Sequence, residues 1–69
     1  MKIYGHGYRD NQDNISLRET VFEILPDEAE RIGRFFLACA TGMSRADWDH
    51  EHFNNGHDPE IVVCKSVKR

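Results

Sequence analysis

One segment of the chain repeats its apolar residues with the spacing of an α-helix, and this segment constrains the fold most. It opens with Pro26-Asp27-Glu28, where proline suits the first helical position and the acids complement the helix dipole. The apolar residues that recur three and four positions apart are Ala29, Ile32, Phe35, Phe36, Cys39, Ala40 and Met43. We expect this helix to end between Thr41 and Ala46, with Gly42 as a breaker.

Three other segments have the apolar patterns of strands. Residues 1–7, 15–25 and 60–67 predict one strand each, and the third has apolar residues on both faces. The polar stretch 8–14 is typical of a hairpin connection. The alternation in the second strand changes parity, and a bulge near Arg18–Thr20 would restore it. Partial burial of both faces at the end of that strand is the alternative.

The resulting element order, β-β-α-β, belongs to the α+β class. A right-handed crossover predicts a three-stranded, mainly antiparallel sheet of strand order 2-1-3, with the helix packed on one face. We expect residues 1–69 to form a single domain, because 69 residues are too few for two. A chain of this size buries only about 60% of its unfolded surface, so a sheet with one bare face favours a homodimer.

Composition and charge exclude several classes of function. With 39% hydrophobic and 30% charged residues, the chain is typical of a globular protein. Its net charge of −3 argues against nucleic acid as a partner, since phosphate contacts need a basic face. We read Lys65, Lys68 and Arg69 as a solvated end. No apolar run suits a membrane span and no secretory signal is apparent, so we expect a cytoplasmic, bacterial-type protein with no membrane partner.

The two cysteines, Cys39 and Cys64, fall within apolar runs and lack CxxC spacing. We predict that both are free and pack as small hydrophobes, with a disulfide between helix and last strand as the alternative. A reactive thiolate needs exposure and a positive neighbour, and a paired-carboxylate hydrolase needs a cleft. We therefore expect no enzymatic activity and no cofactor.

The residues best suited to chemistry are concentrated in the segment 47–58, which holds three of the four histidines. In an extended segment His50 and His52 project to the same side, and a turn at 54–56 could bring His57 to the same metal. Zinc or nickel would suit these nitrogens together with a carboxylate. The carboxylates available as ligands or as orienting groups are Asp47, Asp49, Glu51 and Asp58. The simpler interpretation, which we prefer, is a polar structural or recognition loop between helix and strand that binds no metal.

A protein interface is the other use to which this segment is suited. Trp48 and Phe53 are aromatic residues of the kind that anchors interfaces, unless they tuck into the edge of the core. Asp49 and Glu51 would speed association with a basic partner.

Five short motifs, spread over nearly the whole chain, match the order seen in one known family. They are Met1-Lys2-Ile3-Tyr4-Gly5, Ile15-Ser16-Leu17-Arg18-Glu19, Pro26-Asp27-Glu28, His50-Glu51-His52 and Pro59-Glu60-Ile61-Val62-Val63. In these motifs the chain resembles the immunity protein 32-like family of bacterial polymorphic-toxin systems. The resemblance implies a single-domain protein that neutralises a partner toxin by binding it, and it carries over no catalytic residue.

We therefore expect a non-catalytic protein-binding module whose contact residues are Trp48, Asp49, Glu51 and Phe53. A metal-binding domain that uses His50, His52 and His57 is one alternative, and a structural homodimer is another.

Overall fold

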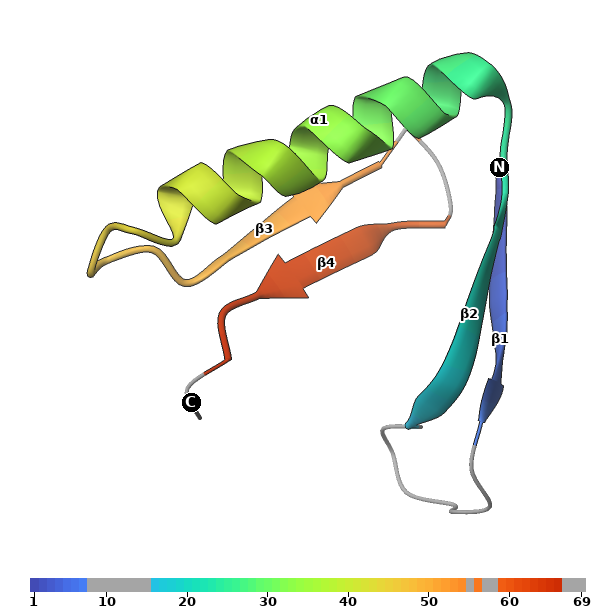
Figure 1. The fold of residues 1–69 in the computed structure, drawn as a ribbon, viewed down its shortest axis with the longest axis horizontal. Helices are drawn as coiled ribbons and strands as arrows, with labels where there is room; N and C mark the ends of the chain where they lie inside the picture. The colour runs from blue at the N-terminus through green and yellow to red at the C-terminus, as the bar shows by residue number, and fades with distance from the viewer. Residues whose placement is uncertain (8–15, 55, 57–58, 67–69) are drawn as a thin grey trace.

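The chain folds into one helix and two separate sheets in the computed structural model, which describes residues 1–7, 16–54, 56 and 59–66. The elements in order are β1 (Lys2–Gly7), β2 (Leu17–Glu23), α1 (Pro26–Gly42), β3 (His50–Phe53) and β4 (Ile61–Cys64). β1 pairs with β2 and β3 pairs with β4, both antiparallel. In Figure 1, α1 lies along the β3–β4 sheet, while the β1–β2 hairpin extends away from the N-terminal end of the helix.

The α+β class is confirmed, but the three-stranded sheet of order 2-1-3 is wrong. β4 pairs with β3 and not with β1, because residues 50–53 form a strand where we expected a loop. Phe53 is the one apolar residue of that strand, so no alternation of apolar and polar residues marks it in the sequence. With a strand this close before β4, a local hairpin replaces the long crossover to β1.

The predicted helix is confirmed, and it ends at Gly42. The reason for this glycine differs from the one predicted, since Met43 follows with right-handed angles (φ −63°, ψ −14°) and no left-handed residue ends the helix. A Cβ at position 42 would lie 2.7 Å from ring atoms Cδ1 and Nε1 of Trp48. Gly42 therefore makes room for Trp48, which packs on the last turn of α1.

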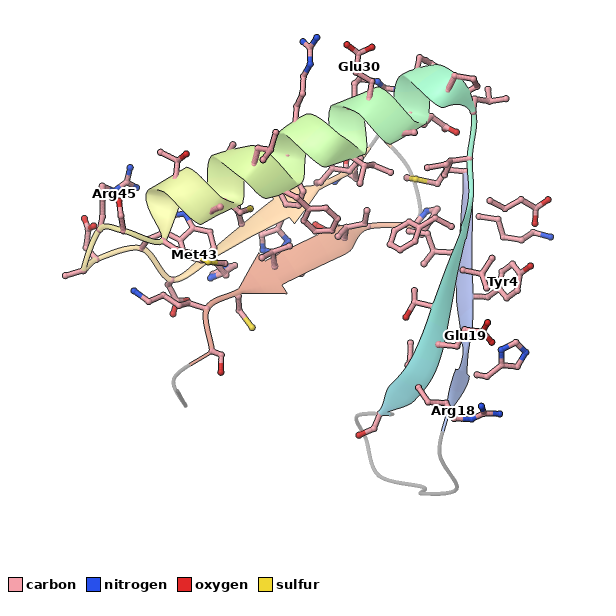
Figure 2. All side chains as sticks on the ribbon, in the orientation of Figure 1. Tyr4, Arg18, Glu19, Glu30, Met43 and Arg45 are labelled. Carbon is pink, nitrogen blue, oxygen red and sulfur yellow. The ribbon has the colours of Figure 1, made fainter. Side chains whose placement is uncertain are left out.

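The predicted bulge in the second strand is confirmed. His6 pairs with Glu19 and Gly7 pairs with Leu17, so Arg18 is the extra residue. One face of the hairpin then carries Ile3, Gly5, Leu17, Thr20 and Phe22, and the other carries Lys2, Tyr4, His6, Glu19, Val21 and Glu23. Figure 2 shows Tyr4 and Glu19 pointing away from β4, so the more apolar face is turned towards the β4 side.

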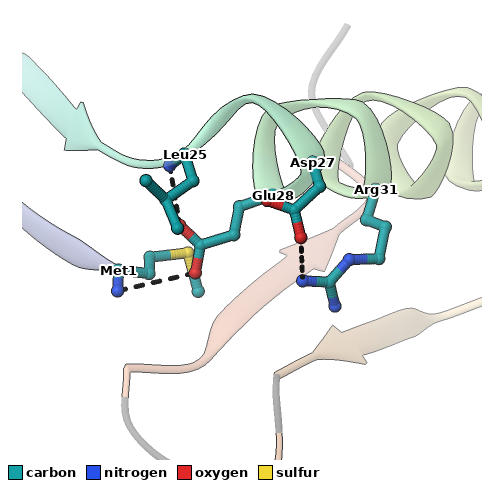
Figure 3. Close-up of polar contacts among 5 residues, drawn as sticks. All are labelled: Met1, Leu25, Asp27, Glu28 and Arg31. Carbon is teal, nitrogen blue, oxygen red and sulfur yellow. Dashed lines mark hydrogen bonds and ion pairs between the residues drawn. The ribbon is translucent and has the colours of Figure 1, made fainter.

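A single carboxylate joins the N-terminal end of α1 to the β1–β2 hairpin (Figure 3). Leu25 stands at the cap position but has no side-chain acceptor. Its N–H instead donates to Glu28 Oε1 at 2.8 Å, while Glu28 Oε2 lies 3.5 Å from the Met1 ammonium. Glu28 is buried, so both contacts are shielded from solvent. We call Met1, Leu25 and Glu28 the helix–hairpin junction.

The core is small. Of the described residues, Ile32 and Cys39 are the buried apolar ones, and no side chain is completely buried. Phe35 packs on Phe53 with their ring centroids 5.3 Å apart. Strands are spaced by only about 4.8 Å, so a two-stranded sheet is too narrow to cover the whole apolar stripe of α1. Ala29, Phe36 and Ala40 are left exposed as a result.

No helix in the described part of the chain is long and apolar enough to cross a membrane.

Candidate interaction surface on the β3–β4 sheet

The β3–β4 sheet has one face against α1 and one bare face. His52 is opposite Val62, and Phe53 is opposite Ile61, so successive residues alternate between the two faces. The face towards α1 carries Glu51, Phe53, Ile61 and Val63, while the bare face carries His50, His52, Val62 and Cys64. We call the second set the outer face. Val62 is 52% exposed on it, so this face is open to a partner.

The two imidazoles of β3 lie side by side on the outer face, as an extended His50-Glu51-His52 segment predicts. Their ring centroids are 5.0 Å apart. His50 Nδ1 lies 2.7 Å from Asp49 Oδ2, and His52 Nδ1 lies 2.7 Å from Glu60 Oε2. Each carboxylate orients one imidazole ring through its Nδ1 atom, and Nε2 is the ring nitrogen that does not contact this carboxylate.

The structure unites two of the three histidines that we predicted as metal ligands. His57 and Asp58 lie outside the described residues, as does the polar connection 8–14. Within the described residues, no three His, Cys, Asp or Glu side chains are placed to hold a metal ion. Asp49 and Glu60 contact the Nδ1 atoms of the two imidazoles, as carboxylates often do with the second nitrogen of metal-bound histidines.

The Glu60 contact is one that sequence reasoning missed. This residue is eight positions from His52, and the two meet only because β3 and β4 pair. The contact could have been predicted if residues 50–53 had been recognised as a strand that pairs with β4.

The four residues predicted to contact a partner do not form one patch. Trp48 packs on Gly42 and Phe53 packs on Phe35, so both aromatic rings are half-buried against the helix. Asp49 lies at the edge of the outer face beside His50. Glu51 lies on the opposite face, which is turned towards α1.

The two cysteines lie in different surroundings. Burial raises the pKa of the Cys39 thiol above its ordinary value of 9.0, and the Glu51 carboxylate raises it further. Cys39 is therefore a protonated core thiol at neutral pH, as predicted. Cys64 is free and exposed, so the prediction that it packs as a buried hydrophobe is wrong.

No pocket is found in the part of the chain that the structure describes. Comparisons with protein-family models, curated proteins and solved structures gave no match. The relation to immunity proteins therefore stays a prediction from the sequence motifs.

Proposed function

We propose that the protein is a non-catalytic binding module of the immunity type, which neutralises a partner toxin by covering it with the outer face of β3–β4. The observation that carries the proposal is this face itself. Its imidazoles are held in place by carboxylates, Val62 of β4 lies exposed opposite His52, and α1 packs along the other side of the sheet. A preorganised surface of this kind binds with little loss of conformational freedom.

The charge around the outer face suits a basic partner. Asp49, beside His50, has a side chain exposed by 89%, and Glu60 stands at the other end of the face. The Lys65 ammonium, by contrast, donates to the Met43 carbonyl oxygen at 3.0 Å and is held against the end of α1. Acidic rims steer basic proteins and raise their association rate.

Trp48 and Phe53 have a positioning role in this proposal. They hold β3 and the segment before it against α1, and the contacts with the partner fall to Asp49, His50, His52 and Val62. Replacing Phe53 by alanine should therefore destabilise the fold by about 2 kcal/mol, somewhat less than for a fully buried phenylalanine. Urea denaturation measures this loss, and Val62→Ala is the matched control, expected to stay within about 0.5 kcal/mol.

The proposal is tested by calorimetric titration with the toxin domain of a polymorphic toxin, which is to be sought in the reading frames next to the gene for this chain. Val62→Lys should weaken binding by roughly tenfold or more, because it places a positive charge at the centre of a contact with a basic partner. Glu30→Ala is the control, since Glu30 lies on the side of α1 away from the sheet (Figure 2). Unchanged affinity of the folded Val62→Lys variant would remove the outer face from the proposal.

Zinc or nickel binding is the second candidate, and the paired orientation of His50 and His52 favours it. Native mass spectrometry of tag-free protein, purified without chelator and then offered zinc, decides this point. One metal per chain that is lost in His52→Ala would support the site. His6→Ala is a matched control, because His6 is also exposed and also has its Nδ1 2.7 Å from a carboxylate, that of Glu19. Metal that is absent, or that survives His52→Ala, would count against this function.

A further inference from the structure

Two apolar surfaces of this chain are left without cover and lie outside the proposed partner site. The first is the hairpin face, defined by Ile3, Leu17 and Phe22, where Leu17 is 47% and Phe22 38% exposed. The second is the helix flank, defined by Ala29, Phe36 and Ala40, which lies on the part of the apolar stripe that β3–β4 leaves bare. Phe36 is 43% exposed. None of these residues carries a charge.

The chain exposes more surface, and is less compact, than a folded single protein of its mass. The chain exposes 5752 Å², whereas a folded protein of 8.0 kDa is expected to expose roughly 4,500 Å². Its radius of gyration is 13.6 Å, against about 11 Å for a compact chain of this length. The excess over the whole chain is about 1,300 Å², which is enough to include the roughly 800 Å² that each partner buries in a standard interface.

The helix–hairpin junction explains why the chain does not cover these surfaces itself. Glu28 binds the Met1 ammonium and the Leu25 N–H, so the hairpin is held at a fixed angle to α1. Pro26 follows directly and restricts the backbone at the bend. The hairpin therefore stays extended, and its apolar face needs a second molecule (Figure 1).

The chemistry of the two surfaces indicates which molecule that is. Permanent interfaces are apolar and depleted of charge, whereas transient ones resemble the ordinary polar surface. A fold with so small a core needs its cover at all times, and another copy of the same chain is the one partner present wherever the protein is made. A two-stranded hairpin is itself only marginally stable without such cover.

We propose that the protein is a homodimer in which the hairpin face of each copy packs on the helix flank of the other. The contact is isologous, so both pairs of surfaces are buried at once. The outer face of β3–β4 remains free in this dimer. The inference is therefore independent of the proposed function, and either can fail alone.

Sedimentation equilibrium of tag-free protein over a wide range of concentration tests the dimer. We expect twice the 8.0 kDa chain mass for the wild type. Ala40→Glu should raise the dissociation constant roughly a hundredfold, because a charge would be buried in an apolar contact without a partner. Ala40 is exposed in the single chain, and glutamate is a good helix former, so the variant should fold.

Val62→Glu is the matched control, since Val62 is also exposed but lies on the outer face. It should remain a dimer. Phe22→Glu tests the second surface, and circular dichroism checks that each variant is folded. A wild type that is monomeric at every concentration would overturn the proposal, as would an Ala40→Glu variant that dimerises like the wild type.

Discussion

Gly33 and Gly42 both lie in α1, but their surroundings differ. A Cβ at position 33 would meet nothing within 4 Å, whereas one at position 42 would press on the Trp48 ring at 2.7 Å. The usual gain of about 1 kcal/mol from replacing helical glycine by alanine should thus appear at only one of the two positions.

We expect Gly33→Ala to stabilise the protein by up to about 1 kcal/mol. Gly42→Ala should destabilise it by about 1–3 kcal/mol, because Trp48 must move or the last helical turn must distort. Guanidinium denaturation of the two variants side by side provides the measurement. Equal effects would mean that Trp48 does not pack on Gly42.

The thiols of Cys39 and Cys64 should differ in reactivity, because the first is buried and the second is exposed. At pH 8, a disulfide reagent such as DTNB should label exposed Cys64 at once and buried Cys39 only after unfolding.

The raised pKa of Cys39 also makes the stability of the protein depend on pH. Below pH 9 the thiol keeps its proton in both the folded and the unfolded chain, and above pH 9 the unfolded chain loses this proton first. Stability should therefore fall as the pH rises past 9, and a Cys39→Ala variant should lack this part of the loss.

At the level of elements, the junction between helix and hairpin depends on Glu28. Replacing it by alanine removes the acceptor for the Leu25 N–H and the counter-charge to the Met1 ammonium, so we expect a loss of about 1–2 kcal/mol. Glu30→Ala is the control, because Glu30 makes an exposed pair with Arg34, which is worth at most about 0.5 kcal/mol. Thermal denaturation in low salt compares them, and equal losses would remove Glu28 from the junction.

The sequence predicts some of these elements well and others poorly, for physical reasons. α1 is marked by a proline at its start and a long 3.6-residue period, and the bulge at Arg18 by a change of parity. β3 has no such mark, since three of its four residues are polar. Without β3, the last strand is assigned the wrong partner strand, and the contact between Glu60 and His52 cannot be predicted. The same-side placement of His50 and His52 was predictable because it needs only an extended backbone.

The whole molecule has an open shape, with the hairpin and the helix–sheet unit sharing little surface (Figure 1). Its stability should therefore depend on association. We expect the melting temperature of the wild type to rise with protein concentration, because dimerisation shifts the folding equilibrium by mass action. Ala40→Glu should melt at a lower temperature with little dependence on concentration. Differential scanning calorimetry at several concentrations measures both, and a concentration-independent wild type would contradict the expectation.

The contact between the Met1 ammonium and Glu28 also concerns how the protein is handled. The nitrogen involved is the α-amine, which acetylation, a retained formyl group or a fusion tag would convert into an uncharged amide. Each of these changes would remove the positive charge that pairs with the buried Glu28 carboxylate. A tag placed at the N-terminus would thus alter the molecule under study, and the same tag at the other end would leave this contact intact.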